Sequence, residues 1–442
     1  MNNTVKRLFT LGLSIVMAAG MILPASAAET SKLTAQEQAI MTAIDKSAPN
    51  TKKIAKEIHE FAEPGWKEVK SSKLLMDQLE AQGFKVQRGL VGKHPTLGHK
   101  MDMPTAFKAV YKGGNGGPTI AVLAEYDANP NGHSCGHNLI SAAAFSCAMG
   151  LKQAFQDPKT PGTIIVIGTP AEEMDGAKPA IYEGGYLKEV DLVLASHYSS
   201  RWGSEVSGKA IVWLTHDNWL TFEGVASHAS SSPHKGKDAL DAVMLTALGL
   251  EFMREHSVET DRIHYIIGCG GQQANSVPEK ARLEFELRAN DSGELNHMMK
   301  RVDDIIKGAE LMTGCKAIYK WDCPWYCATP VPTLYHAAAD FANDLGIDGS
   351  QFKFDVPPSA SSDLGTIAYY KPTVEISFPI VKDGETTPGG HTDGITVLTG
   401  TEYAWDQAIY ASKLMALTGY RTVTNQKLFN DVKAEFKANY KE

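Results

Sequence analysis

The amino-acid sequence predicts an α/β fold: a mixed, mostly parallel sheet flanked by helices, interrupted by a smaller inserted α+β domain. Strand-like apolar runs alternate with helix-like segments between residues 119 and 195, which is the pattern of βαβ units. From about residue 208 the order changes to βαββαβ, a compact two-layer unit. Segments of the first type return after about residue 325, so the second unit is an insertion.

The part before the insertion follows from hydrophobic periodicity and from the residues that stop helices. Apolar residues recur at helical spacing in residues 35–63, and Pro64-Gly65 ends that helix. The elements expected next are a helix at 67–82, a strand at 84–86, a strand at 119–125, a helix at 139–155, a strand at 163–169, a helix at 177–184 and a strand at 190–195.

The insertion and the C-terminal part are predicted in the same way. In the insertion we expect a strand at 211–222, a helix at 237–255, strands at 261–268 and 280–288, a helix at 292–312 and a strand at 316–321. After it we expect a helix at 332–345, a strand at 372–378 and helices at 400–418 and 424–438. The domain division is then 1–27 as a signal peptide, 30–207 with 325–442 as the main domain, and 208–324 as the inserted domain.

Composition and the N-terminus indicate an exported globular protein. The chain has 442 residues, of which 43% are hydrophobic, and its net charge of −8 without a basic stripe argues against nucleic-acid binding. Lys6 and Arg7 precede an apolar stretch at 8–23, and Ala25-Ser26-Ala27 offers a cleavage site. We therefore expect a signal peptide and an exported protein (secreted, periplasmic or cell-surface), with an uncleaved anchor as the alternative.

Export makes the six cysteines relevant, because disulfides form outside the cytosol. Cys147 in an apolar helix and Cys269 in an apolar strand are expected to be buried thiols. Cys323 and Cys327 either pair with each other or remain buried free thiols. Cys135 lies in a loop with two histidines, so we interpret it as a candidate metal ligand rather than as a structural thiol.

Metal-binding side chains follow three of the expected strands at the point where each strand ends. The strand before residue 127 leads to Cys135 and His137, the strand at 163–169 leads to Glu172 and Glu173, and the strand at 190–195 leads to His197. In open α/β sheets ligands bind at this edge. Thiolate, imidazole and carboxylate groups suit a borderline divalent metal, so the expected ligands are Cys135, His137, Glu173 and His197.

Further residues extend this expected site. Glu172 is not needed as a ligand, so its carboxylate is a candidate general base for hydrolysis. The alternative is that Glu172 and Glu173 are an acidic pair at the start of a helix. His391 lies in a glycine-flanked turn and is a candidate ligand. Asp127 suits a hydrogen bond to a ligating histidine. His133 is expected to pack the loop, with a third loop ligand as the alternative.

The inserted domain carries three polar residues near strand ends and turns: His228, Asn275 and Arg288. Singly, each is expected to be structural. Together they suit an oxyanion and a substrate carboxylate, with Arg288 beside Asn275 as a clamp for the carboxylate.

These motifs, in this order, resemble the dinuclear-metal aminoacylase and carboxypeptidase-type metallopeptidase family. Within it the chain is most similar to the amidohydrolase branch that contains p-aminobenzoyl-glutamate hydrolase and the β-alanyl-lysine-type dipeptidases. The resemblance extends from about residue 50 to the C-terminus. It is carried by Glu125-Tyr126-Asp127, the segment Gly132 to Leu139, Pro170-Ala171-Glu172-Glu173, Ser227-His228-Ala229, Ala274 to Pro278, Ser362 to Gly365, and Gly390-His391-Thr392.

The resemblance implies a zinc-exopeptidase-like catalytic domain split by a lid or dimerisation domain, and a homodimer formed through that lid. It implies two divalent metal ions, Zn or Mn with Co possible, bound by Cys135, His137, Glu173, His197 and His391. It implies that Glu172 is the general base, that His228 stabilises the oxyanion from the partner subunit, and that Asn275 and Arg288 bind the substrate carboxylate. The chain departs from the family pattern at Met174-Asp175 and at Tyr198, where glycines and a proline are common.

The expected function is that of an exported metal-dependent amidohydrolase. Its expected substrates are small amides with a free carboxylate: N-acyl amino acids, dipeptides or aryl-amide glutamates. Two alternatives remain open, a cysteine hydrolase that uses Cys135 with His137 or His133, and a non-catalytic exported protein that binds metal or solute. A chelator distinguishes the cysteine hydrolase from the metal-dependent enzyme, because a thiol enzyme keeps its activity after the metal is removed. Glu172 argues against the second, because a binding site needs no carboxylate beyond its ligands.

Overall fold

A computed structural model describes residues 33–96, 98–214, 219–356 and 360–440 of the chain. The expected signal peptide, residues 1–27, lies outside these ranges. Within them, no helix has the length and apolar character needed to cross a membrane.

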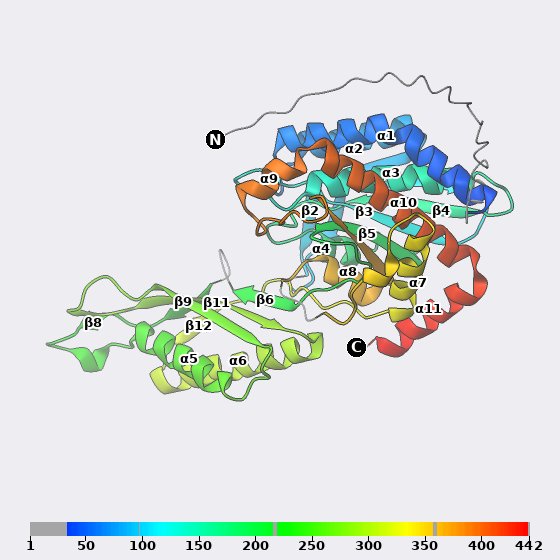
Figure 1. The fold of residues 1–442 in the computed structure, drawn as a ribbon. Helices are drawn as coiled ribbons and strands as arrows, with labels where there is room; N and C mark the ends of the chain where they lie inside the picture. Colours follow the sequence, from blue (N-terminus) through cyan, green and yellow to red (C-terminus); the bar gives the residue numbers. More distant parts are fainter. Residues whose placement is uncertain (1–32, 97, 215–218, 357–359, 441–442) are drawn as a thin grey trace, which may run out of the picture. The chain divides into compact units, whose positions relative to one another are not determined.

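The larger sheet has six strands in the order β1-β2-β4-β3-β5-β13 (Figure 1). They are β1 (Lys85–Lys93), β2 (Lys100–Gly113), β3 (Thr119–Ala124), β4 (Gly162–Gly168), β5 (Leu192–Ser199) and β13 (Thr373–Pro379). The pairs β4–β3, β3–β5 and β5–β13 are parallel, and β1–β2 and β2–β4 are antiparallel. The prediction of a mixed, mostly parallel sheet is confirmed. Strand β2 was not predicted, because its start carries Pro104, a residue that is rare inside strands.

Helices cover both faces of this sheet, which explains why its middle strands are continuous apolar runs. On one face lie α1 (Ala35–Phe61), α3 (His137–Phe155) and α10 (Glu402–Thr424), packed over a core that includes Ile120, Leu194 and Ile376 (Figure 1). The short helices α4 (Lys178–Glu183) and α8 (Leu364–Tyr370) pack on the other face, against residues such as Ile165 and Val193. The remaining helices of this part are α2 (Val69–Ala81), α7 (Pro332–Asn343), α9 (Asp393–Thr399) and α11 (Gln426–Asn439).

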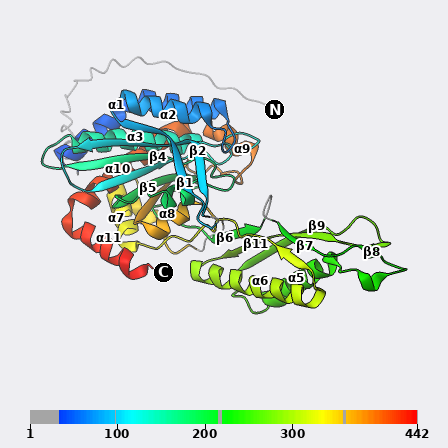
Figure 2. The ribbon, with the colours of Figure 1, turned by 180° about the vertical axis from the view of Figure 1, so that it is seen from behind.

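A second, antiparallel sheet lies within residues 210–318 and has the order β12-β7-β11-β6, with β9 also paired to β11. Its strands are β6 (Ala210–Leu214), β7 (Leu220–Glu223), β9 (Arg262–Cys269), β11 (Lys280–Ala289) and β12 (Lys316–Ile318). Helices α5 (Ala239–Arg254) and α6 (Ser292–Thr313) lie side by side against it in both views (Figures 1 and 2). The short strands β8 (Ser227–His228) and β10 (Ser276–Val277) pair separately. This unit has a hydrophobic core of its own, and the domain limits at 208 and 324 stay a prediction.

Two further details differ from the expectations, and the structure decides between the two alternatives for Cys323 and Cys327. The strand expected at 211–222 is two strands, β6 and β7, separated by residues outside the described ranges. Cys269 is exposed rather than buried, because β9 pairs on one side only and its end faces solvent. Cys323 and Cys327 are free thiols: the first is buried, and the second accepts a hydrogen bond from the Ala210 N–H at 3.1 Å.

Candidate metal centre

The loop between β3 and α3 places Cys135 and His137 on one side of a turn. The chain turns at Gly132 and Gly136, whose φ angles are 96° and 71°, and α3 begins at the next residue, His137. A Cβ at Gly136 would lie 2.7 Å from the Tyr198 ring, so only glycine fits there. The glycines that flank the cysteine therefore let the backbone fold tightly enough to bring both side chains to one point.

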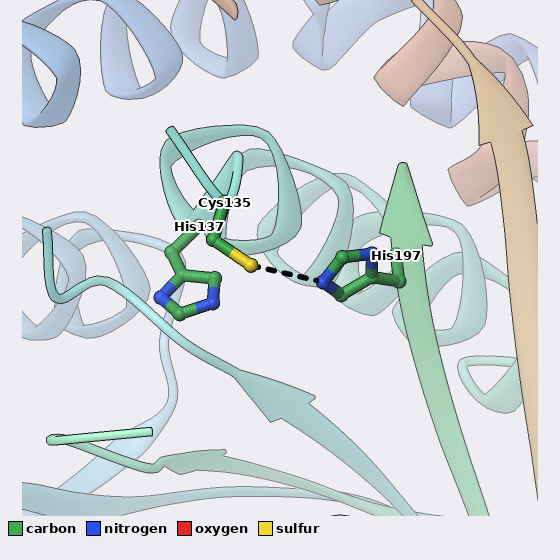
Figure 3. A group of neighbouring side chains, drawn as sticks. All are labelled: Cys135, His137 and His197. Carbon is green, nitrogen blue, oxygen red and sulfur yellow. Dashed lines mark hydrogen bonds between the residues drawn. The ribbon is translucent and has the colours of Figure 1, made fainter. Parts of the chain in front are cut away.

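His197 reaches the same point from the end of β5. Its Nε2 atom lies 3.5 Å from the Sγ atom of Cys135, the contact drawn in Figure 3. Potential ligand atoms of Cys135, His137 and His197 lie within 4.8 Å of one another, and those of Cys135, His137, Glu172 and Glu173 do so as well. Two overlapping sets of donors therefore share the cysteine and His137.

Asp127 orients His137. The Nδ1 atom of His137 lies 2.9 Å from Oδ1 of Asp127 and 3.0 Å from its backbone oxygen. The opposite nitrogen, Nε2, is thereby turned toward three carboxylates: Glu125 at 3.5 Å, Glu172 at 3.6 Å and Glu173 at 3.9 Å.

Two atoms of this cluster are buried without a hydrogen-bond partner among the described residues. They are Nε2 of His137 and Oε1 of Glu173. Buried polar atoms in native proteins are almost always satisfied. An imidazole nitrogen and a carboxylate oxygen that face each other beside a thiol are a donor set for a divalent cation, so the residues present fit a metal.

The turn that carries Glu172 and Glu173 is held from two sides. Oδ2 of Asp127 accepts the Glu173 N–H at 2.9 Å, and Oε1 of the buried Glu68 accepts the Ala171 N–H at 2.9 Å. Ala171 has a φ of 61°, a left-handed conformation that these contacts maintain. Glu68 was not among the predicted site residues, because its partners lie far away in the sequence.

His391 enters the cluster from the C-terminal part of the chain. Its Nε2 atom lies 3.4 Å from Oε1 of Glu173, and its backbone N–H donates to the Ser134 oxygen at 3.2 Å. All five expected ligands therefore meet in one place. His133 does not join them: its Nε2 atom lies 2.9 Å from the Ile58 oxygen, and the side chain packs the loop as expected.

Charges in the cluster shift the pKa values of its members strongly. Burial alone would raise the pKa of the Cys135 thiol, but His197 and His137 lower it well below its usual value. Burial likewise opposes protonation of His197, yet Cys135 raises the pKa of His197 to about 10. Burial and the Cys135 charge raise the pKa of Glu173 to about 7, and burial with the Glu125 charge raises the pKa of Glu172 well above its usual value.

A buried ion network borders the cluster. Nζ of Lys178 lies 2.8 Å from Oε1 of Glu125 and also contacts the carboxylate of Asp363, and the lysine side chain is fully buried. Burial opposes the lysine charge, but Asp363 and Glu125 raise the pKa of Lys178 above its usual range. Asp363 lies in the segment 362–365, one of the motifs named in the sequence analysis. Lys178 lies in no such motif, so the sequence did not identify it as part of the site.

A cavity of about 610 Å³ opens beside the cluster. Its lining includes Cys135, Glu172, Glu173, His197 and His391. Its other lining residues include Arg201, Trp202, Glu205, Trp325, Lys353 and Glu375. A pocket of this size and composition suits a small polar molecule.

The three residues expected from the insertion do not line this cavity. His228 is exposed on β8, and its Nδ1 accepts the N–H groups of Ser230 and Ser231 at 3.2 Å. Asn275 is its neighbour, because the Ala229 N–H donates to the Asn275 oxygen at 3.0 Å. The backbones that carry His228 and Asn275 thus lie side by side at the β8–β10 pair.

Arg288 lies elsewhere in the second sheet. Its Nε donates to Oε1 of Glu286 at 2.6 Å, and it sits opposite Ile211, near the start of β6. The other end of β11, Lys280, pairs with Glu223, from which the chain continues to β8. Eight residues of strand span about 27 Å. The expectation that Arg288 lies beside Asn275 is therefore wrong within a single chain.

Comparisons with known proteins identify a family model and relatives that match this chain. Residues 216–311 match the peptidase dimerisation domain of the M20 peptidases. The chain is 32% identical to mouse (Mus musculus) Xaa-Arg dipeptidase over 350 residues, covering 77% of this chain and 79% of the relative. It is 33% identical to one of the subunits of Escherichia coli p-aminobenzoyl-glutamate hydrolase, covering 66% of this chain and 62% of the relative.

Two solved structures share the fold. One is a dinuclear metal binding peptidase from the M20 family of Bacillus subtilis, with a TM-score of 0.60, 20% identity, and coverage of 88% of this chain and 99% of that one. The other is an aminobenzoyl-glutamate utilization protein from Klebsiella pneumoniae, with a TM-score of 0.64, 20% identity, and coverage of 87% and 98%.

Proposed function

Because the chain belongs to the M20 family of metal-dependent peptidases and amidohydrolases, we propose that it cleaves small amides that carry a free carboxylate beside the scissile bond. Candidate substrates are dipeptides, N-acyl amino acids and aryl-amide glutamates. The observation that carries this proposal is the pair of unsatisfied buried atoms, His137 Nε2 and Glu173 Oε1, with a further carboxylate, Glu172, at the same point.

We assign the metal ligands from this cluster. Cys135, His137, Glu173, His197 and His391 would hold two divalent ions, Zn or Mn with Co possible, since these metals accept mixed sulfur, nitrogen and oxygen donors. Such ions, when bound, lower the pKa of water from 15.7 to about 7 and polarise a carbonyl group. Asp127 would keep the His137 ring in the orientation that presents Nε2 to the metals.

Glu172 is the proposed general base. It lines the cavity and lies 3.6 Å from Nε2 of His137, yet the five ligands are complete without it. In this role its carboxylate accepts a proton from the attacking water and returns it to the leaving amine. The burial and neighbouring charge that raise its pKa favour a carboxylate able to hold that proton.

His228 and Asn275 are proposed to act across a homodimer. The two residues lie together at the β8–β10 pair, away from the cavity lining of their own chain, and the match to a dimerisation domain includes both. His228 would stabilise the oxyanion of the tetrahedral intermediate. With Arg288 at the opposite end of β11, the substrate carboxylate would meet Asn275 of one protomer and Arg288 of the other.

A reconstitution experiment tests the proposed function. The mature protein is stripped with a chelator, reloaded with Zn, Mn or Co, and assayed against dipeptides, N-acyl amino acids and aryl-amide glutamates. We expect no hydrolysis by the stripped protein and recovery after reloading. Activity of the stripped protein, abolished by thiol alkylation, would instead support the cysteine hydrolase, which the lowered pKa of Cys135 favours.

We further propose that the protein is exported. The support is the sequence of residues 1–27 alone: a basic start, an apolar stretch and a small-residue cleavage site. Fractionation of cells that express the full chain, with N-terminal sequencing of the recovered protein, tests export and cleavage together.

A further inference from the structure

Glu375 is a carboxylate in the wall of the cavity to which the proposed mechanism gives no role. It lies on β13 beside Ala195 of β5, in the register that also puts Ser377 beside His197. Its neighbours Val374 and Ile376 are fully buried in the core on the opposite face of the sheet. Because side chains alternate along a strand, Glu375 points to the same side as His197, toward the cavity.

Glu375 has no bonded partner among the described residues, and burial raises its pKa to about 7 although the charge of His197 lowers it. Among the described residues it makes no hydrogen bond and no ion pair, although its charge acts on His197. Lys178, whose charge also reaches it, is already paired with Glu125 and Asp363. A second cavity carboxylate, Glu205, differs, because it accepts the backbone N–H groups of Asp355 and Val356. A partly buried carboxylate without a partner is unfavourable unless a ligand supplies the cation.

The position of Glu375 suits an amine next to the scissile bond. The carbonyl group must lie at the metal cluster, of which His197 is a member. A free α-amino nitrogen is two bonds from the carbonyl carbon, a distance of about 2.5 Å. Such an amine is therefore confined to the surroundings of the cluster, where Glu375 lies on the same side of the sheet as His197.

The lining of the cavity also includes two cationic side chains. Arg201 and Lys353 line it, both are exposed, and neither forms an ion pair within the described ranges. The cavity lining thus contains carboxylates at the cluster, two exposed cations and a further carboxylate, Glu205. A dipeptide is a zwitterion whose amine lies close to the scissile bond, so this amine matches the carboxylates beside the cluster.

We propose that Glu375 binds the free α-amino group of the substrate and makes the enzyme select unblocked dipeptides over N-acyl amino acids. This assignment rests on the proposed amide hydrolysis and narrows its substrates. An N-acyl amino acid has no cation at this point, so it leaves the Glu375 carboxylate desolvated and unpaired.

The test compares an alanyl dipeptide with the corresponding propionyl amino acid, which differs only by the amine. With the metal-loaded, full-length protein we expect kcat/KM to favour the alanyl substrate at least about tenfold, the scale of a charge-assisted hydrogen bond. Glu375→Gln should lower kcat/KM for the alanyl substrate to that for the propionyl substrate and leave the latter unchanged. Glu375→Asp should keep part of the preference, and Glu205→Gln, the matched control, should keep all of it.

Metal content and circular dichroism are measured on every variant. Equal or faster cleavage of the propionyl substrate by the wild type leaves the proposed function intact but overturns the role of Glu375. An equal loss on both substrates in Glu375→Gln, with reduced metal content, overturns it too, because the residue then supports His197. Cleavage of neither substrate nor of any other amide in the panel overturns the proposed function itself.

Discussion

The Nδ1 atom of His137 and the Oδ1 atom of Asp127 lie 2.9 Å apart, and both side chains are buried completely. This contact determines which ring nitrogen of His137 faces the metal cluster. The other oxygen of Asp127 accepts the Glu173 N–H, so one carboxylate positions two expected ligands from different segments.

Asp127→Asn should weaken metal binding about 10- to 100-fold, the usual cost of losing a group that orients a ligand. The amide can still accept from His137, but its NH₂ group cannot accept the Glu173 N–H. Competition with a chromogenic chelator measures the affinity. An unchanged metal Kd in a folded variant would show that Asp127 is structural.

Glu172→Gln and Glu173→Gln form a matched pair of adjacent substitutions. Glu172→Gln should keep its metal and lose at least about 10²-fold in kcat, because the proton acceptor is gone. Glu173→Gln should lose metal affinity, because a ligand is replaced. Bound metal and kcat are determined on the same preparations, and the reverse assignment follows if the two results are exchanged.

Metal loading should release at least about two protons near pH 8, one each from His137 and His197, because only neutral imidazole binds a metal. His391 adds to this number, because its contact with Cys135 raises its pKa as well. Cys135 raises the pKa of His197 to about 10, so His197 is protonated in the metal-free protein below that pH. Asp127 and Cys135 likewise outweigh burial and raise the pKa of His137 well above its usual value. The Cys135 thiolate has no proton to release.

The raised pKa values of these histidines determine how metal affinity depends on pH. Protons compete with the metal below pH 10, so affinity should rise as the pH increases toward that value. Calorimetric titrations in two buffers of different ionisation enthalpy give the number of protons. Identical heats in both buffers near pH 8 contradict the predicted charge state.

His228→Ala should abolish turnover without changing metal content, because the residue is exposed and far from the ligands in the chain sequence and in its contacts. Mixing this inactive variant with inactive Glu172→Gln allows one intact site to form in each mixed dimer. Recovered activity shows that the histidine acts on the partner protomer. No recovery, despite proven exchange of protomers, shows that it acts within its own chain.

Blocking the substrate carboxylate as an amide should cost roughly 1.5–3 kcal/mol in kcat/KM, the scale of hydrogen bonds to charged groups. Arg288→Ala should cost a similar amount on the free acid and little on the blocked substrate. Arg288 is paired with Glu286 at 2.6 Å, so Glu286→Gln serves as a control that keeps the cation. Equal rates of the wild type on both substrates would falsify carboxylate recognition.

Local sequence patterns predicted most of the elements and the group of side chains that the structure brings together. Hydrophobic periodicity is a local property, so it located α1, α3 and β3 within a few residues. The rule that parallel strands end at one edge was enough to bring Cys135, Glu173 and His197 together from the sequence alone. Strand β2 was missed because Pro104 and nearby charges hide its pattern.

The sequence by itself determined which chemical groups the cluster contains, because residue types and the ends of strands are local features of the chain. Only the tertiary structure decided which charges are paired. Lys178 is held by Glu125 and Asp363, whereas Glu375 has no partner among the described residues, and no local pattern distinguishes these side chains. It also decided that Arg288 lies at the end of β11 away from Lys280, whereas Asn275 precedes Lys280 in the chain, because strand register and length fix distances that sequence order leaves open.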